Sequence, residues 1–182
     1  ALVRGNGERW PLMTAPFLHY NSIHFIMNAL GLLYLGRRIE SLARWPHVPM
    51  VFLFSAWIGG EFTLLGKAGV TVLGASGGIM GMLGFLLVFE VLHAKLVPRS
   101  AKRRLMAALV GTALIGVIGI QFIDNLAHAG GFVAGCLYAG IVFPKSDSVL
   151  RPRSSTTDLV MGYATFLAMA AAVAFACSKM LA

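Results

Sequence analysis

The sequence has few charged residues, and this scarcity excludes most classes of soluble protein. Only 12% of its 182 residues are charged and 58% are hydrophobic, whereas a soluble globular domain has roughly 25% charged residues. The mean hydropathy is +0.78. A composition of this kind predicts an integral membrane protein.

Acidic residues are the scarcest charged type. Seven Asp and Glu stand against fifteen Lys and Arg, which gives a net charge of +8. A basic chain can bind nucleic acid, but these basic residues lie between long apolar runs, as they do in the cytoplasmic loops of membrane proteins. We therefore expect no nucleic-acid partner, and we expect the lipid bilayer to surround the protein.

Cysteine is also rare. Cys136 and Cys177 both lie inside apolar runs, with no other Cys or His near them at metal-ligand spacing. They are typical of small apolar packing residues rather than of a disulfide or a zinc site, so we expect no metal and no cofactor. A cleavable signal peptide is not recognisable either, because residues 1–16 are mixed in polarity and lack an apolar core.

Long apolar segments predict the fold class. A helix that crosses a bilayer needs about 20 mostly apolar residues, since a helix satisfies its own backbone hydrogen bonds in lipid. The segments that meet this criterion are approximately 19–36, 48–65, 76–94, 104–122, 125–143 and 158–180. The sequence therefore predicts an all-α, polytopic transmembrane helical bundle.

The basic residues predict the orientation of this bundle. The loops 37–48, 95–104 and 144–157 hold eleven of the fifteen Lys and Arg, and the opposite side holds four. By the positive-inside rule these three loops face the cytoplasm, and both termini face outward. An outward N-terminus without a signal peptide predicts that a further span precedes Ala1.

Two polar residues in the first predicted span are candidates for function, because polar side chains are costly inside a membrane. His24 and Asn28 are four residues apart, so on a helix they share one face and could donate hydrogen bonds to a single oxygen. The alternative is that they satisfy each other or link neighbouring helices.

Ser76 lies within Gly74-Ala75-Ser76-Gly77-Gly78, where a loop becomes the third predicted span. A serine in this place is ordinarily an N-cap. The flanking glycines nevertheless leave its hydroxyl uncovered, and a helix N-terminus offers free N–H groups to an oxyanion. The string also fits G-x-S-x-G, but the nucleophile elbow of soluble hydrolases needs a β-sheet that this sequence does not predict.

His128 lies beside a row of small residues in the fifth predicted span. Ala127, Gly131 and Gly135 are spaced by four, which forms a smooth groove where another helix can approach closely. An imidazole at the edge of such a groove can reach a serine hydroxyl, although a lone membrane histidine is more often a packing residue. Asp124 either orients His128 or is a loop residue at the aqueous face. The sequence therefore favours a Ser–His dyad over a triad.

Three motifs, in this order, resemble those of the rhomboid family of intramembrane serine proteases. They are H-x-x-x-N at 24–28, G-x-S-G at 74–77 and A-H-x-x-G-x-x-x-G at 127–135, and the resemblance covers about residues 10–143. It implies that Ser76 is the nucleophile and that His128 is the general base and acid. It also implies residues that bind the oxyanion or organise the site, namely His24, Asn28, Gly74 and Gly77.

The resemblance divides the chain into three parts. Residues 1–143 correspond to a protease core, with a loop similar to the family's first loop followed by five transmembrane helices. A cytoplasmic linker, 144–157, leads to an additional C-terminal transmembrane helix, 158–182. The first core helix of the family has no counterpart in this sequence, and Met80 stands where many relatives have an aromatic residue that stacks on the catalytic histidine.

The expected function is therefore that of an intramembrane serine endopeptidase that cleaves transmembrane protein substrates. We expect it in a bacterial plasma membrane, with the active site towards the outer side. One alternative is a catalytically inactive rhomboid-like protein that binds transmembrane clients. A small-solute transporter or channel is a further alternative, but it predicts an internal repeat that the sequence lacks. The substrate and the oligomeric state do not follow from the sequence.

Overall fold

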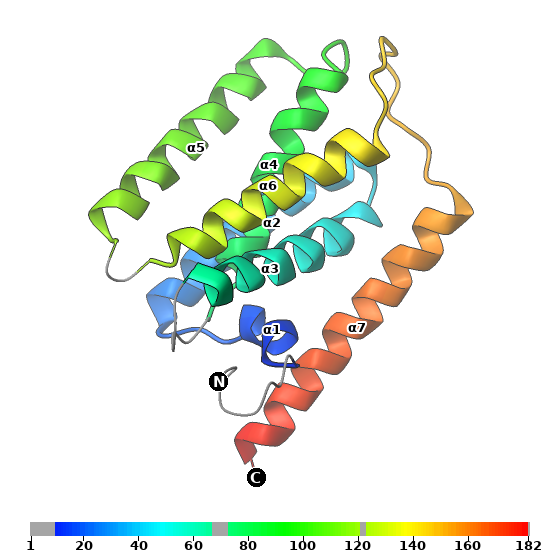
Figure 1. The fold of residues 1–182 in the computed structure, drawn as a ribbon. Helices are drawn as coiled ribbons and strands as arrows, with labels where there is room; N and C mark the ends of the chain where they lie inside the picture. Colours follow the sequence, from blue (N-terminus) through cyan, green and yellow to red (C-terminus); the bar gives the residue numbers. More distant parts are fainter. Residues whose placement is uncertain (1–9, 67–72, 121–122, 182) are drawn as a thin grey trace.

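The computed structural model describes residues 10–66, 73–120 and 123–181, and these residues form helices and no strand (Figure 1). The all-α bundle predicted from the sequence is confirmed. The elements in chain order are α1 (Trp10–Thr14), the 3₁₀ helix η1 (Ala15–Phe17), α2 (Ser22–Ala43), α3 (His47–Gly66), α4 (Ser76–Leu92), α5 (Arg99–Ile118), α6 (Asn125–Val142) and α7 (Thr156–Leu181).

Helices α2 to α7 correspond to the six predicted spans. Within the described residues, α3, α6 and most of α7 are long and apolar enough to cross a membrane, and α4 is apolar but has 17 residues. Helix α2 contains His24 and Asn28, and α5 begins with a basic stretch, so neither meets the same criterion of length and hydropathy. The helices themselves are as expected, and membrane crossing by α2 and α5 stays a prediction.

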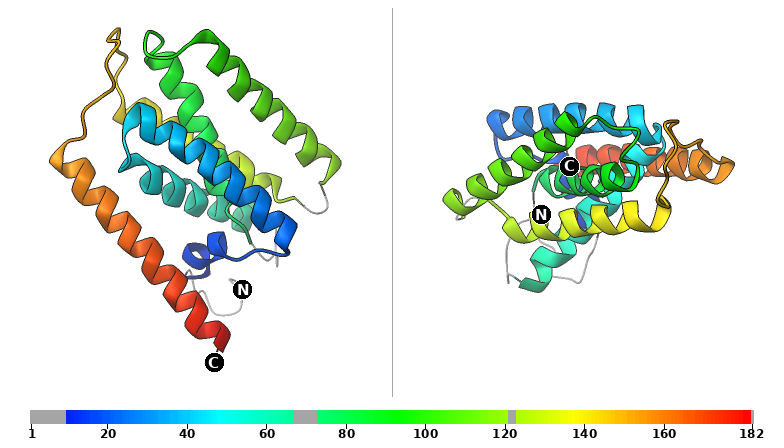
Figure 2. Two further views of the ribbon diagram at one scale, coloured as in Figure 1. Left: turned by 180° about the vertical axis from the view of Figure 1, so that it is seen from behind. Right: turned by 90° about the horizontal axis from the view of Figure 1, so that it is seen from above.

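Helix α4 is the centre of the bundle. It packs against α2, α3, α5 and α6, and seen from above it lies between α2 and α6 (Figure 2). Almost all residues of α4 are apolar or glycine, so every face of the helix is suited to burial, which is the pattern of a fully buried helix. Phe85 and Phe89, for example, are both completely buried in the core. The position of Ser76, the first residue of α4, is therefore fixed by the packing of this helix against its neighbours.

Helix α7 lies at the side of the bundle, along α3 and α1 (Figure 1). Gly162 packs against Pro46, and the rings of Trp45 and Tyr163 meet edge to face with their centroids 4.7 Å apart. The helix begins with a capping box, in which the Ser155 N–H donates to Asp158 and the Asp158 N–H donates to the Ser155 hydroxyl. It therefore starts two residues before the predicted boundary at 158.

Candidate active site

Ser76 is the first residue of α4 and is partly buried. The N-cap position is occupied by Ala75, and this helix end has no side-chain capping hydrogen bond. The alternative in which Ser76 serves as the N-cap is therefore wrong. Because the first N–H groups of a helix have no partner within it, the hydroxyl stands beside unpaired backbone donors.

The loop before Ser76 is fixed by backbone geometry. Gly74 has a φ of +107°, a conformation that residues with a side chain rarely adopt. Its N–H donates to the carbonyl oxygen of Ala15 over 3.0 Å, which ties the loop to η1. A β-carbon on Gly74 would lie 2.7 Å from Cε1 of His24 and 3.5 Å from Nδ2 of Asn28. Both side chains of α2 thus lie directly against this glycine.

Asn28 is buried, with 7% of its surface exposed. Its Nδ2 is fully buried and has no hydrogen-bond partner among the described residues. In the alternative interpretation, His24 or another helix would satisfy this amide, and the described side chains do not provide that partner. A buried donor without a partner costs about 1–3 kcal/mol, so its presence at this position calls for an explanation.

The backbones of α4 and α6 are in contact along a row of glycines. A β-carbon on Gly77 would lie 3.3 Å from the carbonyl oxygen of Ala127. Further along, Gly131 faces the carbonyl oxygen of Gly77, and Gly135 faces that of Gly81, both too closely for any β-carbon. The groove of small residues on α6 is therefore the surface that packs on α4.

This contact brings the two chemical candidates to the same end of the bundle. Ser76 immediately precedes Gly77, and His128 immediately follows Ala127, which opposes Gly77. His128 is partly buried in the first turn of α6. Residues from α2, α4 and α6 thus surround one small region.

Asp124 is the N-cap of α6. One carboxylate oxygen accepts the N–H of Ala127 over 3.2 Å, and the other accepts the hydroxyl of Thr63 over 2.6 Å. The carboxylate therefore joins α3 to α6 and satisfies a helix end. Among the described residues Asp124 makes no hydrogen bond to His128, which favours a dyad over a triad.

A cavity of about 840 Å³ lies between α2 and α3 and reaches the site at Asn28 and Ala75. His19 also lines it, and its ring meets that of His24 edge to face at 5.1 Å. The cavity depends on how α2, α3 and α7 are arranged, so no local pattern in the sequence indicates it.

Fold and site together define a helical integral membrane protein in which a serine, two histidines and an asparagine gather at one end of a buried helix. The family model described as "Rhomboid domain" matches residues 6–145. This chain therefore belongs to the rhomboid family.

Relatives of the chain come from a plant and a bacterium. It is 33% identical over 138 residues to RHOMBOID-like protein 6, mitochondrial, of Arabidopsis thaliana, which covers 75% of this chain and 44% of that protein. It is 28% identical over 143 residues to Rhomboid protease GluP of Bacillus subtilis (strain 168), covering 78% of this chain and 28% of that protein. It is 25% identical over 134 residues to Inactive RHOMBOID-like protein 8 of Arabidopsis thaliana, covering 71% and 37%.

The chain thus spans less than half the length of each of these relatives. Their names include a protease and an inactive protein, so membership of the family defines an intramembrane protease or a rhomboid-like protein. The relatives include plant and bacterial proteins, one of them mitochondrial by name, so they do not support the expectation of a bacterial plasma membrane over another membrane.

Proposed function

We propose that this protein is an intramembrane serine endopeptidase that cleaves transmembrane protein substrates with a Ser76–His128 dyad. The observation that carries the proposal is the close packing of α4 on α6, with Gly77 against Ala127. This packing keeps the hydroxyl and the imidazole on neighbouring helix ends. A serine alone is a weak nucleophile, and an adjacent imidazole is the base that activates it.

The reaction follows from these roles. His128 accepts the proton of the Ser76 hydroxyl while the serine oxygen attacks the scissile carbonyl carbon. His128 then gives this proton to the leaving amine, which leaves an acyl group on Ser76. A water molecule, deprotonated by the same imidazole, releases the acyl group as a carboxylic acid and restores the serine.

The oxyanion of the tetrahedral intermediate would be held by donors that are already in place. The backbone N–H groups at the start of α4 and the side chains of His24 and Asn28 supply them. Nδ2 of Asn28 is buried and has no partner within the part of the chain that the structure describes, which supports this role, because fixed donors need no reorganisation when the charge develops.

The side of the membrane also belongs to this proposal. Ser76 and His128 lie in the first turns of α4 and α6, and two of the basic loops, 95–104 and 144–157, follow the opposite ends of these two helices. The third basic loop, 37–48, lies at the end of α2 that is far from His24. With these loops in the cytoplasm, the site opens towards the outer side.

The test is cleavage of a model transmembrane substrate by the purified chain in liposomes, beside the Ser76→Ala and His128→Ala variants. We expect cleavage by the parent and none by either variant. Ser178→Ala, a change at an exposed serine of α7, is the matched control and should leave cleavage unchanged. A parent chain that binds the substrate helix without cutting it would instead support the inactive, client-binding alternative.

A further inference from the structure

A second cavity, of about 540 Å³, lies at the end of the bundle opposite to Ser76. The linker from α6 to α7 and the ends of α3, α4, α6 and α7 line it. Figure 1 shows the course of this linker from the end of α6 to the start of α7. This is the end at which the basic loops gather. No part of the proposed protease chemistry uses it.

Two buried imidazoles line this cavity, His47 at the start of α3 and His93 just after α4. Each is only 3% exposed. Nδ1 of His47 lies 2.9 Å from the hydroxyl of Tyr138, and Nδ1 of His93 lies 3.2 Å from the carbonyl oxygen of Phe89. Both rings also pack edge-on against Phe143. These contacts fix both rings in the wall of the cavity, so the donors for a ligand come from its other residues.

The linker supplies two guanidinium groups, from Arg151 and Arg153. The backbone between them is fixed, because Nε–H of Arg44 donates to the carbonyl oxygen of Pro152 over 3.2 Å. The start of the linker is fixed as well, since the Ser146 N–H donates to the carbonyl oxygen of Leu92 over 3.0 Å. These two bonds fix the backbone of the linker over the cavity, and the exposed side chains of Arg151 and Arg153 extend from this backbone.

The acid that lines the cavity is Asp158, and it is already engaged. Its Oδ2 accepts the N–H of Ser155 over 2.7 Å in the capping box of α7. Two arginines thus stand against one capped carboxylate, and three serine hydroxyls also line the space, those of Ser146, Ser148 and Ser155. The cavity favours an anion that accepts several hydrogen bonds at once.

A phosphate group has this chemistry. Its oxygens accept N–H and O–H donors from several directions, and the planar guanidinium of arginine matches its geometry. Val142 and Leu150 add an apolar rim to the cavity. Anionic phospholipid headgroups lie at the cytoplasmic surface of a membrane, where polybasic segments attract them. We propose that this cavity binds the phosphate group of an anionic phospholipid, independently of the proposed proteolysis.

The test measures binding of phosphatidylglycerol to the full, delipidated chain in neutral detergent by native mass spectrometry. Arg151→Gln/Arg153→Gln should weaken binding about tenfold or more, since each charge-assisted hydrogen bond to a phosphate is strong. The matched control is Arg103→Gln/Arg104→Gln on α5, which removes the same charge from exposed side chains at the same end of the bundle. This control should bind as the parent does.

Two further arms decide the source of the phosphate. Zwitterionic phosphatidylcholine should bind more weakly than phosphatidylglycerol, and millimolar inorganic phosphate should not displace the lipid. If inorganic phosphate displaced the lipid, the cavity would still be a phosphate site, but the proposal that its ligand is a phospholipid would be wrong. Equal weakening by both double variants, or no weakening by either, would overturn the site, provided that thermal unfolding shows all the proteins folded.

Discussion

Among single residues, Gly135 makes the clearest prediction. Its added β-carbon would overlap the carbonyl oxygen of Gly81, a backbone atom that cannot rotate away. Gly135→Ala must therefore push α6 from α4, and overpacking of this kind costs about 1–3 kcal/mol. We expect the free energy of unfolding in detergent to fall by about this amount, measured by denaturant titration.

Gly140 provides the control on the same helix. Nothing lies within 4 Å of a β-carbon added there. Since alanine is better than glycine in a helix by roughly 0.5–1 kcal/mol, Gly140→Ala should leave the free energy of unfolding unchanged or raise it. An equal fall in the free energy of unfolding in both variants would mean that the contact of Gly135 with α4 is not the cause of the destabilisation.

Gly74 makes a prediction about activity. Gly74→Ala would strain the backbone at a positive φ and displace the ring of His24. If His24 is an oxyanion donor, its displacement should slow cleavage by about 100-fold or more, the usual cost of losing one such donor. The substrate assay measures this rate. Gly111→Ala, at an open position of α5, should cleave at the parent's rate, and a Gly74→Ala variant that does the same would remove His24 from the proposed site.

At this scale the sequence identified the candidates because they are unusual. Ser76, His24 and His128 are polar residues in apolar segments, and the free-energy cost of a polar side chain inside a membrane makes each of them a candidate for function. The partners of Asp124 could not be predicted in the same way. Its bond to Thr63 joins residues 61 positions apart and depends on how α3 lies beside α6.

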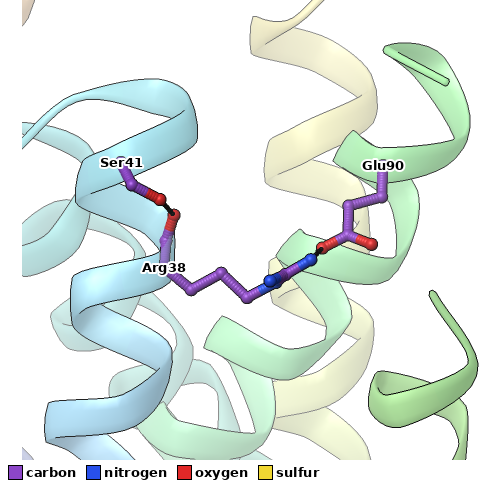
Figure 3. A network of polar contacts seen from close by, with 3 residues as sticks. All are labelled: Arg38, Ser41 and Glu90. Carbon is purple, nitrogen blue, oxygen red and sulfur yellow. Dashed lines mark hydrogen bonds and ion pairs between the residues drawn. The ribbon is translucent and has the colours of Figure 1, made fainter. Parts of the chain in front are cut away.

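Between elements, a buried ion pair joins α2 to α4. Nε of Arg38 donates to Oε1 of Glu90 over 2.7 Å, and Figure 3 shows the arginine side chain extending to the carboxylate. The hydroxyl of Ser41 donates to the backbone carbonyl oxygen of Arg38. The side chains are 23% and 1% exposed. Arg38→Met would leave a buried carboxylate without its partner, so we expect the free energy of unfolding to fall by about 3–5 kcal/mol in a denaturant titration.

Two further variants separate the pair from the loss of one side chain. Arg38→Met/Glu90→Gln removes both charges and should recover most of the stability, because no buried charge remains. Lys95→Met breaks the exposed pair with Asp147, whose atoms are 3.7 Å apart, and should change little. A double variant as unstable as Arg38→Met would show that the arginine acts through packing instead.

The elements themselves were the most predictable level of structure. Apolar runs gave six helices, since the length of a run and its polar borders are local properties. Helix α7 begins at Thr156 and not at the predicted residue 158, because Ser155 and Asp158 form a reciprocal cap. The groove of small residues beside His128 indicated that α6 packs near Ser76. The other neighbours of α4 could not be predicted, because an almost wholly apolar helix indicates burial but not which elements cover it.

For the whole molecule, the distribution of charge predicts which end faces which compartment. The linker of the second cavity and the start of α2 lie at opposite ends of the bundle, because α4 and α6 run from one to the other. Single cysteines can report on each end. The natural thiols must first be removed by Cys136→Ala and Cys177→Ala, since Cys177 is exposed.

In this background, Tyr20→Cys places a thiol beside the proposed active site, at a residue that is 85% exposed, and Ser148→Cys places one in the exposed linker. In sealed vesicles with the outer face outward, a membrane-impermeant maleimide should label Tyr20→Cys at once and Ser148→Cys only after permeabilisation. The reason is that the loops with most of the Lys and Arg stay in the cytoplasm. Labelling in the reverse order would place the active site on the cytoplasmic side, so that substrates would have to be cut from there.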